Sequence, residues 1–468
     1  MWNISLFLIP IAVASALFME LMDSAALATA LPTLSRIFHV APFHLKIALT
    51  AYLVTVAVLV PASSWFSCRL GMKKTFMLAM AIFIAGSVCC GLSNSFAQLV
   101  GARILQGMGG SMMLPVGRSI IVATSPRAHL VKALSWFTLP AIAGPLMGPP
   151  LAGALLEYAN WRWIFLINVP IGLCGLLVVA MIVPGSPGLK PGRFDWTGFL
   201  LAVVTILIVM VEIETAGLAG HSYALRLLAV LVAITAGYLF CRHARNADAI
   251  VDLRLLKHRS LSISLVAGWF QRFPLGATPY LLPLLLQMAL RLSPLVAGQI
   301  MSAMAIGSIA ARFMLPPILR RLGFRTAGIL LAAFSAAMSG VPAFFGFSTS
   351  IQLMMIVLAL SSLARGLFFL LVQALAYLDL ENDEVGHVSV MFTVAQQISY
   401  SMGVELGAWL LLLSSDGDMT NVNAFRMPFI VIALLGALSA LAFILLRRDA
   451  GEVARGLPPD QGARINAR

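Results

Sequence analysis

Three ionisable residues interrupt apolar stretches in the first quarter of the chain, and together they could carry protons. Glu20 and Asp23 stand three residues apart, so in a helix they share one face. Arg103 lies in another apolar stretch; if both stretches cross a membrane, Asp23 and Arg103 come to a similar depth, about 9 to 12 Å below one surface. Two carboxylates beside one arginine in a low-dielectric medium titrate in separate steps, which suits a proton carrier. The alternative is a static ion pair that holds two helices together.

A second polar set recurs every four residues near the C-terminus and forms one stripe on a helix: Thr393, Gln397, Ser401 and Glu405. A stripe that ends in a carboxylate is costly against lipid, so we expect it to face a cavity or a polar neighbour. Arg272 and Arg365 fall near the middle of two other apolar stretches. Each is a candidate partner for a substrate or for Glu405, and each could equally be a structural counter-charge.

The composition places these residues in a membrane. Of the 468 residues, 60% are hydrophobic and only 10% are charged, against roughly 45 to 50% and 25% in soluble domains. Apolar stretches of about 20 residues recur along the whole length, and each is long enough to cross a hydrocarbon layer of about 30 Å as a helix. We therefore expect an all-α, polytopic protein embedded in a lipid bilayer.

The excess of basic residues is interpreted as a topology signal. A formal net charge of +13 would suggest a nucleic-acid partner in a soluble chain, but here the cations cluster in short connections between apolar stretches. If the N-terminus is inside, most of the 31 lysines and arginines face the cytoplasm, and the positive-inside rule puts both termini there. The five cysteines show no metal-ligand spacing. We expect no nucleic-acid partner, no metal and no cofactor.

Fourteen spans are predicted, and they divide the chain into four parts. The spans lie near 5–31, 44–66, 75–93, 97–121, 133–157, 163–184, 196–216, 224–241, 260–288, 295–318, 326–347, 350–376, 388–413 and 426–446. The parts are an N-terminal six-helix half (1–184), a linker with two extra spans (185–259), a C-terminal six-helix half (260–446) and a disordered cytoplasmic tail (447–468).

A short motif repeats at the same place in both halves. The stretch SWFSCRLGMKK (64–74) connects the second and third spans, and LRRLGFRT (319–326) follows the second helix of the C-terminal half. Both contain Arg-Leu-Gly with a cation two positions later. A parallel repeat of this kind is typical of transporters whose halves rock against each other.

Four stretches carry a resemblance to a known family. The stretch AIAGPLMGPPLAGALLEYANWRWIFLINVPIG (141–172) resembles the drug:proton antiporters of the major facilitator superfamily, in the branch with fourteen helices. LMDSAALATALP (21–32) is similar to the first-helix signature of that family, RILQGMGG (103–110) to its fourth-helix signature and SWFSCRLGMKK to its loop signature. The resemblance implies a major facilitator fold of two six-helix halves plus two inserted helices.

The resemblance also implies roles for individual residues. It assigns proton coupling to Asp23 and Arg103, and the spacing adds Glu20. Gln106, in the fourth-helix signature, joins Arg272, Arg365, Gln397, Ser401 and Glu405 as a candidate for the substrate cavity. A cluster in span five brings small residues together with prolines and predicts a bend, with simple helix packing as the alternative reading: Gly144, Pro145, Gly148 and Pro149.

The loop signature departs from the family pattern at one chemically important position. Five residues form the expected gating loop: Cys68, Arg69, Gly71, Lys73 and Lys74. In the family an acid at the place of Cys68 is thought to latch the two halves together on the cytoplasmic side. A neutral thiol makes no charge-assisted contact, so we expect the resting protein to lean toward the inward-open state.

These patterns favour secondary active transport: export of a hydrophobic or amphipathic, often cationic, small molecule in exchange for protons across the inner membrane. Uptake or exchange of a metabolite or siderophore on the same scaffold is the alternative. A membrane-embedded lipid enzyme would need a set such as HExxH or GxSxG, and the sequence has neither. It also has no GxxxxGK[ST] loop for nucleotide. We expect no enzyme activity, and the sequence does not identify a periplasmic adaptor partner.

Overall fold

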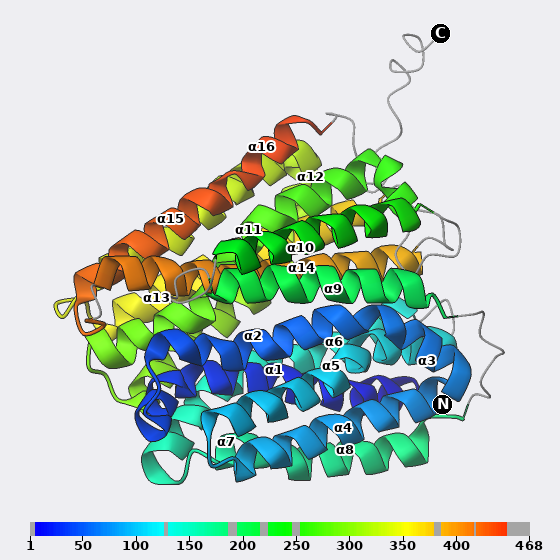
Figure 1. The fold of residues 1–468 in the computed structure, drawn as a ribbon, viewed down its shortest axis with the longest axis horizontal. Helices are drawn as coiled ribbons and strands as arrows, with labels where there is room; N and C mark the ends of the chain where they lie inside the picture. Colours follow the sequence, from blue (N-terminus) through cyan, green and yellow to red (C-terminus); the bar gives the residue numbers. More distant parts are fainter. Residues whose placement is uncertain are drawn as a thin grey trace.

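The computed structural model describes residues 5–125, 130–185, 194–215, 223–245, 253–378, 385–415 and 418–446. Within these ranges all regular secondary structure is helical, as expected (Figure 1). The predicted tail, residues 447–468, lies outside the described residues.

The long helices follow one another along the chain in groups of six, two and six, when α2 with α3, α7 with α8 and α15 with α16 each count as one helix and α12 counts as two. The N-terminal half contains α1 (Ser5–Phe38), α2 (Pro42–Leu59), α3 (Ser63–Leu70), α4 (Met72–Leu92), α5 (Phe96–Thr124), α6 (Leu130–Tyr158), α7 (Trp163–Leu166) and α8 (Asn168–Ile182). The inserted pair is α9 (Trp196–Thr215) and α10 (Tyr223–His243). The C-terminal half contains α11 (Arg259–Leu284), α12 (Pro294–Gly340), α13 (Ile351–Ala376), α14 (Val385–Ser415), α15 (Arg426–Ala437) and α16 (Ser439–Ile444). The division into domains at 184, 259 and 446 stays a prediction.

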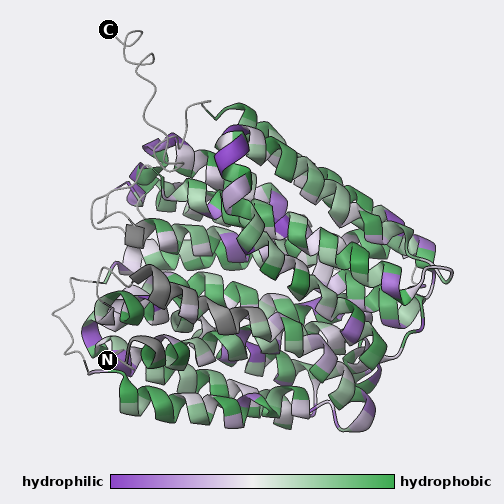
Figure 2. Ribbon diagram, turned by 180° about the vertical axis from the view of Figure 1, so that it is seen from behind, coloured by the Kyte–Doolittle hydropathy of each residue, from purple (hydrophilic) through white to green (hydrophobic). Residues whose placement is uncertain are grey.

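Length and surface chemistry both fit a membrane protein. Nine helices among the described residues are long and apolar enough by themselves to cross a bilayer. Many large apolar side chains are exposed on the surface of the helix bundle, such as Leu177, Met181 and Leu231. Figure 2 shows hydrophobic residues along most of the helices, with fewer hydrophilic ones both at the helix ends and inside the bundle. Such a surface is suited to lipid rather than water.

Two glycines reverse the chain at the two copies of the repeated motif. Gly71 (φ 84°) and Gly323 (φ 71°) are the glycines with positive φ in the described part of the chain, a conformation that costs other residues energy. Gly323 breaks α12 into two antiparallel helices. The loop expected at 64–74 is therefore mostly helix: α3 continues to Leu70 and the chain turns at Gly71 alone. We call this end of the bundle the basic end, and the opposite end, with residues 39–41 and 290–293, the far end.

The hydrophobic core differs between the two ends. At the far end, one cluster includes buried residues from both halves, such as Leu31 and Phe165 with Tyr280 and Phe425. Toward the basic end, buried residues form two separate clusters, one in the N-terminal half and one in the C-terminal half. The halves are thus joined more extensively at the far end than at the basic end.

The inserted pair lies along one side of the seam between the halves. Helix α9 contacts both α2 and α14, and Figure 1 shows α9 and α10 running beside this pair of helices. On the other side of the seam α6 packs against α12, where Gly298 lies directly against the carbonyl of Pro149. Glycine allows this close approach because it has no Cβ.

Candidate functional site

Asp23 and Arg103 form a buried ion pair inside the N-terminal half. Both side chains are 1% exposed, and the guanidinium of Arg103 on α5 donates to the carboxylate of Asp23 on α1. The other carboxylate oxygen accepts from the amide nitrogens of Asn168 (2.7 Å) and Gln106 (3.3 Å). The expected meeting of Asp23 and Arg103 is present, while their role in proton coupling stays a prediction.

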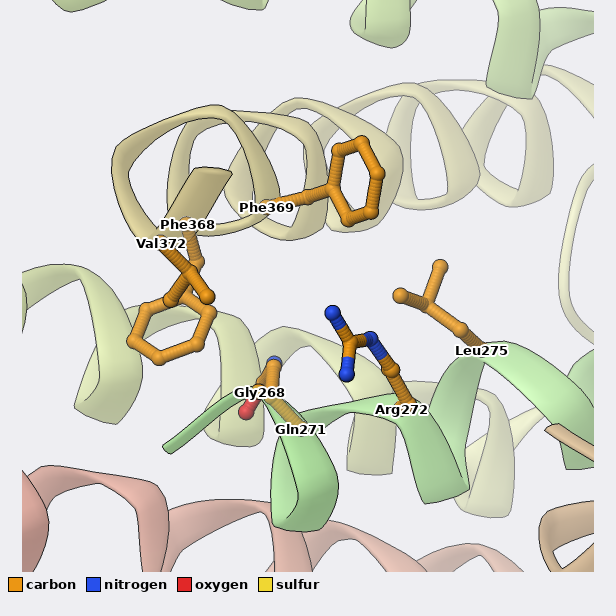
Figure 3. A pocket seen from close by; sticks show the side chains of 7 residues that line it. All are labelled: Gly268, Gln271, Arg272, Leu275, Phe368, Phe369 and Val372. Atoms are coloured by element: carbon orange, nitrogen blue, oxygen red, sulfur yellow. The ribbon is translucent and has the colours of Figure 1, made fainter. Parts of the chain in front are cut away.

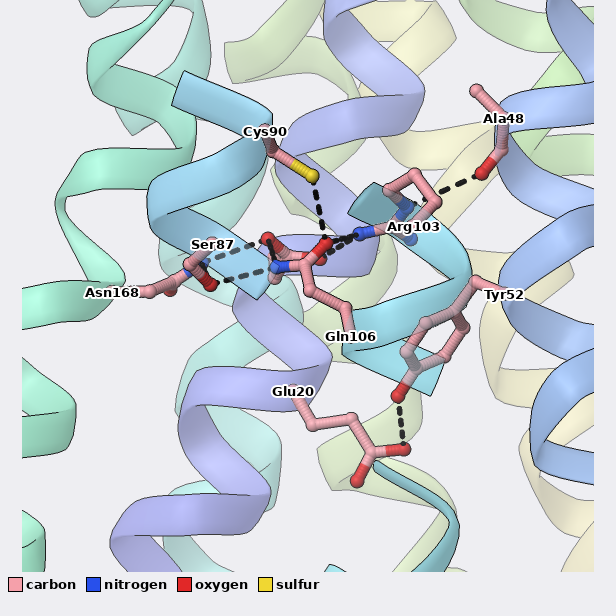
Figure 4. A network of polar contacts seen from close by, with 9 residues as sticks. Glu20, Ala48, Tyr52, Ser87, Cys90, Arg103, Gln106 and Asn168 are labelled. Atoms are coloured by element: carbon pink, nitrogen blue, oxygen red, sulfur yellow. Dashed lines mark hydrogen bonds and ion pairs between the residues drawn. The ribbon is translucent and has the colours of Figure 1, made fainter. Parts of the chain in front are cut away.

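Arg103 is held by further partners on neighbouring helices (Figure 4). Its Nε donates to the carbonyl oxygen of Ala48 on α2 at 3.2 Å, and a terminal nitrogen donates to Gln106 Oε1 at 2.7 Å. The guanidinium also lies 4.7 Å from the ring centre of Tyr52. A buried arginine with several hydrogen bonds and an ion pair is well compensated for its desolvation.

Gln106 connects this network to α4. Its amide nitrogen donates to Ser87 Oγ at 2.7 Å, and its oxygen accepts from the thiol of Cys90 at 3.3 Å. The side chain is fully buried. Gln106 was expected in a substrate cavity; in this conformation its groups are engaged by Asp23, Arg103, Ser87 and Cys90 instead.

Glu20 is separate from the ion pair. It does share the face of α1 with Asp23, but its Oε1 accepts from the hydroxyl of Tyr52 at 2.8 Å, so the two carboxylates do not both bind Arg103. The other oxygen, Oε2, is buried and has no hydrogen-bond partner among the described residues. The expectation of two carboxylates on one arginine is therefore wrong, because Tyr52 lies between Glu20 and the guanidinium.

Glycines in the fourth-helix signature let α5 approach its neighbours. A Cβ added at Gly107 would lie 2.7 Å from Thr55 on α2, and one at Gly110 would overlap the Tyr52 hydroxyl. At Gly109 it would meet backbone atoms of Ala79 and Phe83 on α4 at 2.6 Å. The signature thus places Arg103 and Gln106 between α1, α2 and α4.

The Gly-Pro cluster of α6 packs the helix against α1. Added Cβ atoms at Gly144 and Gly148 would meet the backbone of Met22 at 2.9 Å, next to Asp23 in sequence. The packing reading of this pair is therefore supported. Helix α6 runs without interruption from Leu130 to Tyr158, and a functional bend at Pro145 and Pro149 stays a prediction.

A second buried ion pair crosses the seam between the halves. Lys46 Nζ on α2 lies 2.5 Å from Glu405 Oε2 on α14, with side-chain exposures of 1% and 3%. Lys46 is buried because α14 packs against α2, which begins at Pro42. Arg272 and Arg365 were candidate partners of Glu405, but its carboxylate binds Lys46 instead.

The other residues of the stripe on α14 differ in burial. Ser401 is buried, and its hydroxyl lies 3.3 Å from the sulfur of Met210 on α9. Thr393 donates to the carbonyl of Ser389 on its own helix, and Gln397 is half-buried. A role for Gln397 and Ser401 in substrate binding stays a prediction.

The C-terminal half contains two buried arginines on facing helices. Arg365 on α13 is 3% exposed and donates to the hydroxyl of Thr278 at 2.8 Å. Arg272 on α11 is 1% exposed, and its guanidinium lies 4.3 Å from the ring centre of Phe392. Its three nitrogens form no hydrogen bond within the described ranges. Figure 3 shows this guanidinium pointing between the rings of α13 and Leu275.

The cations of the gating loop have local partners. Lys73 donates to the carbonyl oxygen of Ala180 at 2.7 Å, in the last turn of α8, where a positive charge is favourable. Arg69 lies over the ring of Trp65 at 5.0 Å, while Lys74 and Cys68 are exposed. These contacts describe a loop tied to α8, and its gating role stays a prediction.

Sequence comparison decides the family to which these features belong. The sequence model of the Major Facilitator Superfamily matches residues 13–404, and again residues 265–464. The chain belongs to the Major Facilitator Superfamily. Proteins of this family are membrane transporters rather than enzymes. The chain is accordingly a multi-pass secondary transporter.

Relatives and solved structures agree with this assignment. The chain is 34% identical over 451 residues to a putative multidrug resistance protein MdtD of Klebsiella pneumoniae (strain 342), with 94% of each chain covered. An auto-inhibited peptide transporter of the POT family superposes with a TM-score of 0.69 at 17% identity, covering 94% of this chain and 96% of that one. A D-xylose-proton symporter gives a TM-score of 0.68 at 14% identity, with 99% of both chains covered. These structures share the fold.

Several site residues escaped the sequence analysis. Tyr52, Ser87 and Asn168 are isolated polar residues in apolar stretches, and such residues need partners in lipid. That signal is present in the sequence, but it does not say which helix supplies the partner. Lys46 was missed because its closeness to a predicted helix end made it resemble a surface residue.

Proposed function

We propose that this protein exports hydrophobic or amphipathic small molecules across the inner membrane in exchange for protons. The basic end then faces the cytoplasm, together with both termini, as the distribution of lysine and arginine favours. The name of the relative from Klebsiella pneumoniae, a putative multidrug resistance protein, supports this substrate class.

The observation that carries the proposal is the pair of carboxylates buried on one face of α1. Asp23 is neutralised by Arg103, whereas Glu20 accepts only from Tyr52 and leaves Oε2 without a partner in the described residues. Protonation stabilises a buried carboxyl group that has an unpartnered oxygen, because an ionised carboxylate inside the membrane needs a nearby cation. Tyr52 contacts both the carboxyl of Glu20 and the guanidinium of Arg103. A proton gained at Glu20 can therefore influence Arg103, and through it Asp23.

Alternating access supplies the link to transport. The shared core and the Lys46–Glu405 pair hold the halves together at the far end, and the cores separate toward the basic end. This arrangement supports an inward-facing state. Opening toward the far side must separate Lys46 from Glu405, so the energy of this pair contributes to the balance between the two states.

Transport in everted membrane vesicles tests the proposal. An acidic lumen should drive accumulation of cationic and neutral dyes, and collapse of the pH gradient should abolish it. Asp23→Asn should remove the coupling, and Glu157→Gln, a change at an exposed far-end acid, should not. Export driven by lumenal acid supports the proposal. Release of preloaded compound under the same gradient would instead indicate proton-coupled uptake.

A further inference from the structure

The strongest unexplained feature of the described structure is the guanidinium of Arg272. It is 1% exposed and lies within the membrane-spanning part of α11, and Nε and both terminal nitrogens lack hydrogen-bond partners in the described residues. The guanidinium lies over the face of Phe392, 4.3 Å from the ring centre. Attraction to a ring is weaker than the desolvation of a full charge, so Phe392 alone leaves the cation poorly compensated.

Arg272 points into a small cavity between α11 and α13 (Figure 3). On α11 the lining is formed by Gly268, Gln271, Arg272 and Leu275, and on α13 by Phe368, Phe369 and Val372. The free volume is about what one water molecule needs. A polar group of that size fits beside the guanidinium, with apolar and aromatic surfaces around it.

A second arginine increases the positive charge at the same place. Arg365 stands three and four residues before the two phenylalanines of the cavity, and therefore on the same face of α13. One of its nitrogens donates to Thr278, and its Nε has no partner within the described ranges.

The acid that could neutralise these arginines is occupied elsewhere. Glu405 lies in the same half but pairs with Lys46 across the seam. By contrast, Arg103 in the N-terminal half has its own carboxylate. The C-terminal site therefore has an excess of positive charge in a medium where charges require partners.

We propose that Arg272 binds the carboxylate of an amphipathic organic anion, with Arg365 as the second positive charge and the surrounding rings in contact with the apolar body. This inference rests on the proposed transport function and adds amphipathic organic anions to the compounds that the protein would carry. The planar guanidinium matches a carboxylate through two parallel hydrogen bonds, which a lysine ammonium cannot provide. Because free space is limited, the rings of Phe368 and Phe369 must move apart when the body of the ligand enters.

Binding of three matched probes to the full-length protein in nanodiscs tests the proposal. The probes share a naphthalene ring and differ in the head group: 1-naphthoate, the neutral 1-naphthamide and the cationic 1-naphthylmethylammonium. Naphthoate should bind at least about 30-fold more tightly than the other two, because a buried cation loses its partner when the charge is absent. Equal affinity for the acid and the amide would overturn the proposal.

Variants locate the site. Arg272→Gln should weaken naphthoate binding by roughly 30-fold or more, and Arg272→Lys should weaken it less, because the charge remains but the planar fork is lost. Arg312→Gln, which removes an exposed arginine of α12 in the same half, should leave affinity unchanged. If Arg272→Gln is too unstable to purify, Arg272→Lys and Phe369→Ala carry the test. Unchanged naphthoate affinity in both would overturn the proposal.

Transport of the same probes separates this inference from the proposed function. Proton-driven accumulation of cationic dyes without naphthoate binding would reject the anion site and keep the transporter. Saturable naphthoate binding that depends on Arg272, with no proton-driven movement of any compound, would keep the site and reject the proposed export.

Discussion

In the N-terminal half Arg103 binds Asp23, Gln106 and a backbone carbonyl, whereas in the C-terminal half Arg272 rests on a phenylalanine ring with its nitrogens unbonded in the described structure. Both arginines are 1% exposed, so burial does not distinguish them. The difference is in the neighbours: amides, a hydroxyl and a carboxylate bond to the first, whereas the second lies mainly among aromatic and aliphatic side chains, with the amide of Gln271 nearby but not bonded to it. A completed polar network holds its members in place, while an incomplete one retains affinity for a partner from outside.

The largest effect is expected from removing the carboxylate that completes the N-terminal network. Asp23→Asn keeps the shape of the side chain but cannot cycle a charge, so proton-driven dye transport should fall by about 100-fold or more. The variant should still insert, because the amide can accept from Asn168. Transport rates in everted vesicles, normalised to protein level, provide the measurement, and Glu157→Gln is the control. A variant as active as the parent would refute the proton-carrier role.

The ion pair that crosses the seam should give the next largest effect. Glu405→Gln leaves Lys46 buried without its carboxylate, which should destabilise the far-end-closed state by about 3 to 5 kcal/mol. Thermal unfolding and the reactivity of a cysteine introduced at the far end would show this as a lower Tm and a faster reaction.

Replacing both partners of that pair should reverse much of the loss. Lys46→Met together with Glu405→Leu removes both charges and keeps apolar volume, so stability should approach that of the parent. If the double variant loses as much stability as Lys46→Met and Glu405→Leu lose when their separate losses are added, the two side chains are not coupled and the pair does not join the halves.

Two glycine substitutions contrast the rigidity of the halves. At Gly109 an added Cβ meets backbone atoms of α4 at 2.6 Å, so Gly109→Ala should cost about 1 to 3 kcal/mol of stability. At Gly268 the added Cβ meets the end of the Arg272 side chain at 3.1 Å. Because that flexible end can move, Gly268→Ala should cost less stability.

Gly101→Ala is the matched control on α5, because no atom lies within 4 Å of the added Cβ. The Tm values of the three variants should therefore rank with Gly101→Ala highest and Gly109→Ala lowest. Gly268→Ala should still weaken naphthoate binding by crowding Arg272. Equal losses of Tm in Gly109→Ala and Gly268→Ala would show that the site around Arg272 is as rigid as the one around Arg103.

The smallest effect is expected at the gating loop. Cys68→Asp introduces the acid of the family pattern, and a latch at the basic end would lower the reactivity of a cysteine introduced there. Because position 68 is exposed, water and salt weaken the new contact, and the change should be a few-fold at most. Cys68→Asn, of similar shape but uncharged, is the control. Equal reactivity in the two variants would show that the site is a plain turn.

The sequence by itself determined the all-α membrane fold and the order of the helices, and it placed Asp23 and Arg103 at a similar depth. Apolar stretches of membrane length leave helices as the available structure, because backbone groups in lipid need internal hydrogen bonds. Equal depth in the membrane made a contact between Asp23 and Arg103 possible, and the packing of α1 against α5 decided it. The repeated Arg-Leu-Gly contains Gly71 and Gly323, whose positive φ angles come from the structure alone.

Only the tertiary structure decided which helices face each other, and therefore which buried charges have partners. Depth along a helix follows from residue number, but rotation and neighbours depend on packing of the whole bundle. Tyr52 thus lies between Glu20 and Arg103, and Lys46 takes the carboxylate of Glu405. Arg272 is left with Phe392 because Glu405, the one acid among the described residues 259–378 and 385–415, pairs with Lys46.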